Sequence, residues 1–577
     1  MAKIELSARR HSAGHVLAAA VLQMFPEAKL GTGPATDTGF YYDFLLPRPL
    51  IPEDLPILEE KMREISKKQI PFERFEEPVE KAKTFLKKIG QNFKIELIEK
   101  FQKKDPDLKS VSFYKNGEIF VDLCEGPHVA HTGQIGAFEL THFSAAFWQG
   151  DPNRETMTRI YGLCFENEKK LRAHKKLLEE AKARDHRKLG RQLDLFCFSE
   201  KVGAGLPLFT PRGTFLRNII ADTISKIQEK YGFEKVAIPH ITKKDLYEIS
   251  GHWAKFKDDL FHVRGKGDTE FVMKPMNCPH HAQIFAARPR SYKDLPIRYA
   301  EVTTCYRDEL PGELLGLSRV RSLTQDDGHI FCRVAQIEKE ARNIVAVIRE
   351  FYTKLGMFGK NDFWVSLSVR DPKTPEKYLG DPKNWDAAEK FLEKVAVSEK
   401  LNFKKVEGEA AFYGPKLDFQ FRDAIGREWQ LATIQIDFVQ PENFKLEFTN
   451  EKGEKERPVM IHRAVAGSLE RFLAVIIEHF AGVFPPFLAP TQFAILPVNS
   501  AHEAPAKKLL QKIGGRGEIF SADESLGKRI RDAQMRKIPF LLVLGDAEVS
   551  SGKVVVRRHG EKSQTEMEIA AFQKLLK

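Results

Sequence analysis

Residues 271–333 concentrate side chains that can bind metals and anions. Cys278 lies in the string Lys-Pro-Met-Asn-Cys-Pro, and His329 ends the string Thr-Gln-Asp-Asp-Gly-His. A third candidate, His462, is expected where a later helix begins. One thiolate and two imidazoles are ligand types that zinc prefers, and three protein ligands with one open position are typical of a catalytic zinc site. The spacing does not show that the three converge, so a buried cysteine and two ordinary histidines are the more frequent interpretation.

A second group of possible ligands lies near the N-terminus. Residues 7–25 predict a helix with Ser7 as its N-cap, and two histidines four residues apart share one of its faces. An alternating tract after Gly117 predicts a strand that delivers a cysteine to a loop with a third histidine. These are zinc-type ligands, although core or solvated histidines and a buried cysteine fit the pattern equally well. The four residues are His11, His15, Cys124 and His128.

Length and composition narrow the class of protein. A chain of 577 residues predicts three or four domains, and its net charge of +11 favours a polyanionic partner such as RNA, although a basic enzyme without such a partner fits too. The six cysteines are scattered singly, so no disulfides are expected. The N-terminus lacks an apolar signal sequence, and Glu478 and His479 interrupt the most apolar run. A cytoplasmic protein without membrane contact is expected, and no Walker loop is found.

Several longer strings stand in order along the chain. Residues 232–239 read Gly-Phe-Glu-Lys-Val-Ala-Ile-Pro, residues 306–309 read Tyr-Arg-Asp-Glu, and residues 467–472 read Gly-Ser-Leu-Glu-Arg-Phe. They resemble the three motifs of class II aminoacyl-tRNA synthetases. Further strings make the chain similar to the threonyl-tRNA synthetases over nearly its whole length. These strings cover residues 273–279, 324–327, 412–416 and 460–463.

The resemblance implies an α+β multidomain fold, and local patterns agree with its parts. A charged tract with a thin apolar seam predicts an exposed connecting helix. Thr210 and Pro211 predict an N-cap followed by proline at the first helical position, and alternating tracts from Lys416 and Trp429 predict antiparallel strands. Beyond Pro490, apolar tracts alternate with helical ones as in an α/β unit. The implied domains are an α+β editing domain at 1–165, a linker helix at 166–190, a class II catalytic domain with an antiparallel sheet at 191–485 and an α/β anticodon-binding domain at 486–577.

By resemblance, the chain is an ATP-dependent threonine–tRNA ligase that joins L-threonine to tRNA(Thr) through threonyl-adenylate. The resemblance also implies one Zn2+ per chain and Mg2+ with ATP. It assigns the α-phosphate of ATP to Arg307, the γ-phosphate to Arg471 and the adenine to Glu309. The implied zinc ligands are Cys278, His329 and His462; the catalytic residues Arg307, Arg319, Arg471 and Lys416; the ATP-binding residues Arg307, Glu309, Arg319, Gln430 and Arg471; and the threonine-binding residues Asp327, Tyr413, Gln435 and His462.

The N-terminal and C-terminal parts receive RNA-related roles from the same resemblance. The first is expected to hydrolyse mischarged seryl-tRNA(Thr) without a required metal, and the second to bind the anticodon. A homodimer formed through residues 232–239 is also implied. The implied editing residues are His11, His15, Lys94, Asp122, Cys124 and His128, and the implied anticodon-binding residues are Glu548 and Arg557.

Three departures and two alternatives accompany this interpretation. Glu125 stands where many relatives have arginine, His280 stands where many have glycine, and the small ubiquitin-like domain that opens many bacterial relatives is expected to be absent. A stand-alone metallohydrolase built on the N-terminal cluster is one alternative. A catalytically inactive, synthetase-like RNA-binding regulator is the other. Retention of Arg307, Arg471 and the zinc-type ligands argues against both.

Overall fold

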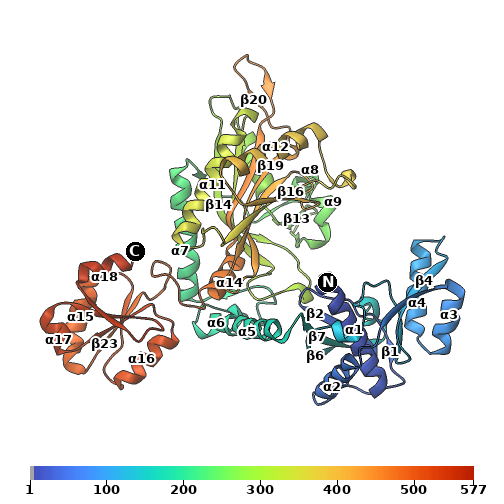
Figure 1. Cartoon of the computed structure of the whole chain (residues 1–577). Coiled ribbons are helices and arrows are strands. Elements are labelled where there is room, and N and C mark those ends of the chain that lie inside the picture. Colours follow the sequence, from blue (N-terminus) through green and yellow to red (C-terminus); the bar gives the residue numbers. More distant parts are fainter. Residues whose placement is uncertain (1–4) are drawn as a thin grey trace. The chain divides into compact units, whose positions relative to one another are not determined.

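The structure is a computed structural model that describes residues 5–577 (Figure 1). Contacts within the chain define two compact units, Met1–Glu179 and Glu180–Lys577. Within residues 5–577, no helix combines the length and the apolar character needed to cross a membrane. The predicted α+β organisation is confirmed, because each unit combines helices with largely antiparallel sheets.

The first unit contains two antiparallel sheets, of order β1-β2-β7-β6 and β3-β4-β5. Side chains alternate along β2, so Phe40, Tyr42 and Phe44 enter the core formed with α1 and α2. The elements are α1 (Leu6–Met24), β1 (Lys29–Leu30), β2 (Gly39–Leu45), α2 (Asp54–Lys67), β3 (Phe72–Pro78), α3 (Val79–Lys88), α4 (Asn92–Lys104), β4 (Ser110–Asn116), β5 (Phe120–Leu123), β6 (Ala137–Phe147) and β7 (Thr156–Phe165).

Helix α1 begins earlier than the sequence predicted. Its N-cap is Glu5, which has extended backbone angles, and the backbone N–H of Arg9 donates to the Glu5 carbonyl over 3.3 Å. Ser7 therefore lies inside the first turn, and the prediction that it caps the helix is wrong. A serine near a helix start is only an approximate marker, because a helix can begin at any residue whose preceding backbone is extended.

The expected connecting helix is divided into two. Helix α5 (Glu168–Arg184) ends one residue before α6 (His186–Gln192) begins. Asp185 separates them: its backbone leaves the helical region, and its carboxylate accepts a hydrogen bond of 2.8 Å from the Arg187 N–H. An aspartate at this position favours a new N-cap over continuation of the helix.

The second unit is organised around an eight-stranded sheet of order β10-β14-β15-β22-β19-β18-β16-β17, in which only the two outermost pairs are parallel. The predicted strands after Lys416 and around Trp429 are confirmed as β18 and β19, which pair antiparallel. Along β18, the apolar Leu417, Phe419 and Phe421 enter the main core and leave the polar residues on the opposite face.

Helices α7, α11 and α14 contribute to the same main core. Helix α7 has the predicted N-terminus: Thr210 accepts a hydrogen bond from the Gly213 N–H, and Pro211 is the first helical residue. The elements are β8 (Phe196–Cys197), β9 (Leu208–Phe209), α7 (Pro211–Lys230), β10 (Glu234–Lys235), β11 (Ile241–Lys243), α8 (Asp245–Ile249), α9 (Trp253–Phe256), β12 (His262–Arg264), β13 (Glu270–Met273), α10 (Cys278–Ala286), β14 (Ile297–Tyr306), β15 (Ser322–Cys332), α11 (Ile337–Lys354), β16 (Phe363–Val369), α12 (Pro382–Ser398), β17 (Phe403–Glu407), β18 (Lys416–Arg422), β19 (Glu428–Asp437), α13 (Val439–Asn443), β20 (Phe448–Thr449), β21 (Lys455–Glu456), β22 (Val459–Ser468) and α14 (Leu469–His479).

His462 lies in a strand, and the prediction that a helix begins there is wrong. It is in the middle of β22, and α14 starts only at Leu469, with Ser468 as its N-cap. Strand β22 is central in the sheet and buried along most of its length. A strand covered on both faces carries a continuous apolar run, which the sequence alone does not distinguish from a buried helix.

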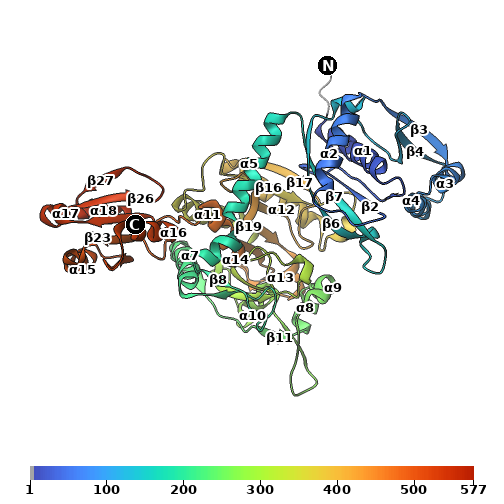
Figure 2. The same ribbon diagram turned by 90° about the horizontal axis from the view of Figure 1, so that it is seen from below.

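The last part of the chain forms the predicted α/β unit. Its five-stranded sheet has the order β24-β23-β25-β26-β27, with α15 and α18 on one face and α16 on the other (Figure 1 and Figure 2). The elements are β23 (Phe493–Pro497), α15 (Glu503–Ile513), β24 (Gly517–Ile519), α16 (Leu526–Met535), β25 (Phe540–Leu544), α17 (Asp546–Ser551), β26 (Val554–Arg558), β27 (Gln564–Met567) and α18 (Ile569–Leu575).

A buried ion pair fixes the centre of the large sheet. Asp326 lies where the register of β15 and β22 shifts, and one of its oxygens accepts hydrogen bonds from the backbone N–H groups of Val465 and Ala466. The other oxygen is 2.6 Å from Nη1 of Arg463, and both side chains are almost completely buried. The carboxylate thus replaces the strand pairing that the irregular register interrupts.

Asp326→Ala is therefore expected to lower the free energy of unfolding by ~3–5 kcal/mol, because it leaves the Arg463 guanidinium buried without its counter-ion. Glu428→Ala is the control: Glu428 pairs with Arg422 at the surface over 3.0 Å, and its loss should cost less than ~1 kcal/mol. Chemical denaturation followed by circular dichroism measures both. Equal losses for the two variants would contradict a special role for the buried pair.

Candidate functional site

The three residues predicted as zinc ligands converge in the second unit. Cys278 begins α10, His329 lies in β15, and His462 lies opposite His329 in β22. Their ligand atoms all lie within 4.8 Å of one another, and all three residues are buried. Nε2 of His329 is 3.1 Å from Nδ1 of His462, a separation that suits two ligands of one tetrahedral ion.

Neighbouring side chains orient the two imidazoles. Nδ1 of His329 is 2.8 Å from Nδ1 of His281, and Nε2 of His462 is 2.8 Å from a carboxylate oxygen of Asp437. The nitrogens that remain are Nε2 of His329 and Nδ1 of His462, and both face the group. Such partners commonly fix the tautomer of histidine ligands. The donor set therefore fits a zinc ion.

The pKa shifts of the candidate ligands are consistent with a site whose thiol loses its proton when a cation binds. Burial, followed by the nearby carboxylates, raises the pKa of Cys278, and burial lowers the pKa of His329. The imidazole is thus neutral and able to coordinate, whereas the thiol would lose its proton to a bound metal. His280 is not part of the group, and burial lowers its pKa to about 4, so it adds neutral bulk beside Tyr247.

The predicted threonine-binding residues surround this group. Asp327 accepts hydrogen bonds of 2.9 Å from the Asn277 amide and from the Gly328 N–H. The ring of Tyr413 lies 5.3 Å from the ring of His462, and Gln435 is directly opposite His462 in the pairing of β19 and β22. A carboxylate, a phenol and an amide therefore line the space beside the three ligands.

Positive charge gathers where the second and third motifs meet. Nε of Arg471 donates to the Ser318 carbonyl over 3.2 Å, and Nε of Arg319 donates to Glu309 over 2.7 Å. Burial, then the charges of Arg307 and Arg319, lower the pKa of Arg471. Two carboxylates, of Glu309 and Glu313, pair with Arg319. The three guanidinium groups suit a polyphosphate, which compensates their mutual repulsion.

Lys416 and Gln430 meet through an aspartate that the sequence analysis did not single out. Asp418, which is buried, lies 2.8 Å from Nζ of Lys416 and accepts a hydrogen bond of 2.6 Å from Nε2 of Gln430. It also accepts one from Thr433. All four residues lie on the polar face of β18 and β19, as the predicted substrate-lining face requires.

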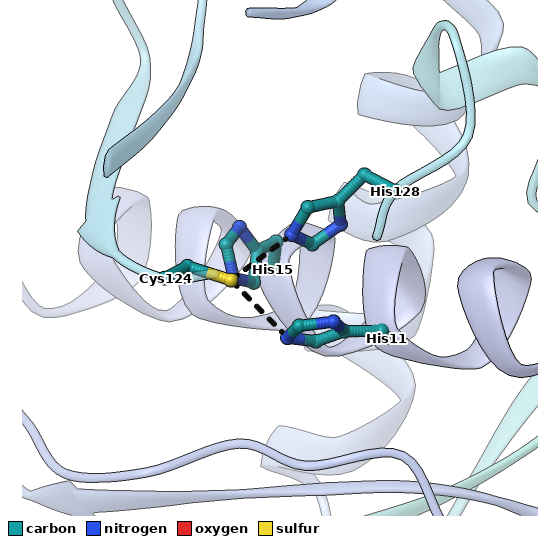
Figure 3. A group of neighbouring side chains, drawn as sticks. All are labelled: His11, His15, Cys124 and His128. Atoms are coloured by element: carbon teal, nitrogen blue, oxygen red, sulfur yellow. Dashed lines mark hydrogen bonds between the residues drawn. The ribbon is translucent and has the colours of Figure 1, made fainter. Parts of the chain in front are cut away.

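The N-terminal set of ligand types also converges, within the first unit (Figure 3). The sulfur of Cys124 is 3.4 Å from Nε2 of His11 and 3.3 Å from Nε2 of His128, and the ring of His15 lies 4.2 Å from that of His128. His11 and His15 come from α1, whereas Cys124 and His128 come from the loop after β5. His11, His15 and Cys124 line a cavity of roughly 1140 Å³.

Lys94 and Asp122 lie on the wall of the same cavity. Nζ of Lys94 is 2.7 Å from one oxygen of Asp122, and the hydroxyl of Tyr42 donates to the other oxygen. Nε2 of His15 is 3.9 Å from that second oxygen. All six predicted editing residues therefore belong to one connected cluster, with Tyr42 as an additional member.

The cluster is neutral apart from the Lys94–Asp122 pair. Burial raises the pKa of Cys124 to about 12, whereas burial, then the charge of His11, lower the pKa of His128 to about 3. Burial also lowers the pKa values of His11 and His15. At neutral pH the imidazoles are thus uncharged, and each keeps a lone pair that can accept a hydrogen bond from water.

The two residues predicted to bind the anticodon lie on separate elements of the last α/β unit. Glu548, in α17, accepts a hydrogen bond of 2.8 Å from the Gly545 N–H, and Arg557, in β26, donates to the Glu561 carbonyl over 2.6 Å. Both contacts are local. The assignment of both residues to the anticodon stays a prediction.

Besides Asp418, three supporting residues escaped the sequence analysis for different reasons. His281 could have been found, because it lies three positions after Cys278 on the same helix. Asp437 could have been found from the two-residue period that places it on the same face as Gln435. Tyr42 gave no such signal, because it stands between Phe40 and Phe44 in what reads as an ordinary core pattern.

Comparisons with known proteins agree with these sites. Residues 261–480 match a family described as the tRNA synthetase class II core domain (G, H, P, S and T). Residues 492–577 match the anticodon binding domain, and residues 111–161 match the threonyl and alanyl tRNA synthetase second additional domain. The last match includes Asp122, Cys124 and His128.

Curated and solved relatives extend the likeness over nearly the whole chain. The threonine–tRNA ligase of Rubrobacter xylanophilus is 45% identical, over 98% of this chain and 87% of the relative. That of Gloeobacter violaceus is 47% identical, over 96% and 89%. The crystal structure of the RNA binding domain of threonyl-tRNA synthetase from Cryptosporidium parvum is 34% identical, with a TM-score of 0.62, over 68% of this chain and 97% of that chain.

Proposed function

Because the chain belongs to the threonyl-tRNA synthetase family, we propose that it is an ATP-dependent threonine–tRNA ligase. It activates L-threonine with ATP and transfers the threonyl group to the 3′ end of tRNA(Thr). The observation that carries this proposal is the presence, in one unit, of a buried Cys-His-His group together with an arginine group from α14 and from the segment that joins β14 to β15. A non-catalytic regulator would not need to keep both the Cys-His-His group and the arginine group.

The arginine group binds and orients ATP. Arg307 contacts the α-phosphate and Arg471 the γ-phosphate, while Glu309, held by Arg319, seats the adenine. Attack of the threonine carboxylate on the α-phosphate concentrates negative charge on phosphate oxygens, and guanidinium groups already in place stabilise that charge. The class II core acts on ATP together with Mg2+. Lys416 and Gln430, fixed by Asp418, complete the floor of the site.

The Cys-His-His group selects the amino acid. Cys278, His329 and His462 would hold one zinc ion per chain, which supplies an electrophile for the amino group and the side-chain hydroxyl of threonine. Asp327 accepts a hydrogen bond from the hydroxyl, while Tyr413 and Gln435 enclose the remaining side. Valine has nearly the same shape but no hydroxyl, so it would leave these polar partners unsatisfied.

Serine creates the need for a second site. It has both polar groups of threonine and lacks only a methyl, whose burial is worth about 1–3 kcal/mol, too little for accurate translation. We propose that the N-terminal cluster removes this error by hydrolysing seryl-tRNA(Thr). Its cavity has room for a terminal nucleotide with its ester, and its neutral histidines can orient and deprotonate a water molecule.

We propose the following domain limits and assembly: an editing domain at 1–165, a linker at 166–190, a catalytic domain at 191–485, and an anticodon-binding domain at 486–577 that uses Glu548 and Arg557. A homodimer forms at residues 232–239. In support, β10 is the terminal strand of the large sheet and both its residues are exposed. Light scattering of the purified protein in solution tests the dimer.

Amino-acid-dependent pyrophosphate exchange tests the proposed activity. We expect exchange with threonine, weaker exchange with serine and almost none with valine, since only valine lacks the hydroxyl that the site recognises. Comparable rates with valine and threonine would refute the proposed selection. Absence of exchange with any amino acid would favour the non-catalytic RNA-binding alternative.

A further inference from the structure

A buried histidine outside the ATP and threonine sites joins three segments of the second unit. His186, the first residue of α6, is only 4% exposed. Its Nδ1 is 2.6 Å from an Oε1 oxygen of Glu478, to which its backbone N–H also donates over 3.0 Å. On its other edge, the backbone N–H of Leu317 donates to Nε2 over 3.0 Å.

These contacts fix the protonation of the ring and exclude a metal. A backbone N–H can only donate, so Nε2 of His186 carries no proton and the proton resides on Nδ1, where it is donated to Glu478. Asp185, His186 and Glu478 together are of metal-binding types. Both ring nitrogens are nevertheless occupied, and Asp185 is occupied by the backbone and side chain of Arg187. His186 therefore connects Glu478 with Leu317.

Glu478 provides the fixed end of the connection. It lies in the last turn of α14, whose first turn carries Arg471. Its Oε2 oxygen pairs with Arg427, and the side chain of Arg184 donates to the carbonyls of Glu478 and His479. Hydrogen bonds from two sides thus hold the end of the helix that positions the proposed γ-phosphate contact.

Leu317 provides the other end, in a turn of the second motif. Gly316 has φ +51°, and a Cβ atom there would lie 2.3 Å from Nε2 of His186, so only glycine permits this approach. Leu317 is completely buried, and the Ser318 carbonyl accepts from Arg471 over 3.2 Å. Arg319 follows directly and holds Glu309.

We propose that His186 is a positioning residue for ATP, which locks the turn at residues 316–319 onto helix α14. The inference rests on the proposed function, because it concerns the same ATP site. The Leu317 N–H to His186 bond and the Arg471 to Ser318 bond clamp the turn from two sides. Arg319 and Glu309 on the turn thereby share one frame with Arg471 on the helix. The threonine-binding residues lie on β15, β19, β22 and the Tyr413 loop, outside this clamp.

Two substitutions separate the bonds of His186. The amide of His186→Asn reaches the position of Nδ1, so it keeps the bond to Glu478 and loses the one to Leu317. The amide oxygen of His186→Gln reaches the position of Nε2, so it accepts from Leu317; its side chain loses the bond to Glu478, to which the backbone N–H of residue 186 still donates. Lys188→Ala, at an exposed residue of the same helix, is the control. Threonine-dependent pyrophosphate exchange gives KM for ATP and for threonine, and calorimetry gives the affinity for ATP.

We expect His186→Asn to raise KM for ATP about tenfold or more, as loss of one buried hydrogen bond predicts, while KM for threonine stays within about twofold. His186→Gln should recover most of the ATP affinity, and Lys188→Ala should match the unmodified protein. An unchanged KM for ATP in His186→Asn would overturn the proposal. So would equal impairment in the Asn and Gln variants, a parallel rise of both KM values, or a fall in thermal stability with normal ATP affinity.

Failure of the proposed function would look different. In that case the unmodified protein would show no threonine-dependent exchange, whatever residue occupies position 186. Calorimetric titration with ATP would still compare the Asn and Gln variants. A weaker affinity in His186→Asn than in His186→Gln would support the positioning role, and equal affinities would refute it.

Discussion

Cys278→Ser is expected to lower bound zinc from about one ion per chain to near zero and to abolish threonine-dependent pyrophosphate exchange. A serine hydroxyl is a poor zinc ligand at neutral pH, and two imidazoles alone hold the ion weakly. His329 and His462 would still be oriented by His281 and Asp437, so the loss should reflect one missing ligand. Metal analysis by mass spectrometry and the exchange assay measure the two effects.

Cys305→Ser provides the matched control. Cys305 is also a buried cysteine of the second unit, but it lies outside the zinc group and its thiol donates to the Asn277 side chain, which a serine hydroxyl can also do. This variant should keep its zinc and its exchange activity. If Cys278→Ser retained full zinc, the metal would have to lie elsewhere, and the N-terminal group around Cys124 would be the next site to test.

Local patterns in the sequence were sufficient for elements that have strong end signals or a clear period. Thr210 and Pro211 marked the start of α7, and the alternation after Lys416 predicted β18 with the correct polar face. Two predictions failed for different reasons. The strand around His462 is buried on both faces, and local propensity does not contain that tertiary packing. The break at Asp185 has a local signal, because the aspartate caps the next helix by accepting from the N–H two residues further on, but the sequence analysis did not use it.

The functional sites, too, were only partly predictable from the sequence. Long strings shared with a known family located the ligand types and the arginine group, and the structure brings these residues together. The residues that orient them were much less visible, because their role depends on spatial neighbours. His186 is the clearest case. It accepts a hydrogen bond from the N–H of Leu317, 131 positions later in the chain, and it contacts Glu478, 292 positions later. The residues that flank His186 in the sequence give no indication of these long-range contacts.

Replacement of His11 and His15 by alanine is expected to leave threonine activation unchanged and to slow hydrolysis of seryl-tRNA(Thr) by about 10²-fold or more, the contribution typical of general base catalysis. The two residues belong to the first unit, whereas the activation site belongs to the second. Deacylation of preformed seryl-tRNA(Thr) measures the editing step, and pyrophosphate exchange measures activation on the same preparation. Mischarged tRNA should accumulate when serine is supplied.

The reason for this expectation lies in the geometry of the cavity. The Lys94–Asp122 pair fixes charge on one wall, while the neutral imidazoles beside Cys124 are the groups able to take a proton from water. His142→Ala, at an exposed histidine of β6, is the control and should edit normally. Because His15 is buried, circular dichroism must show that the double variant is folded. A folded double variant that clears seryl-tRNA(Thr) at the normal rate would return both histidines to a structural role.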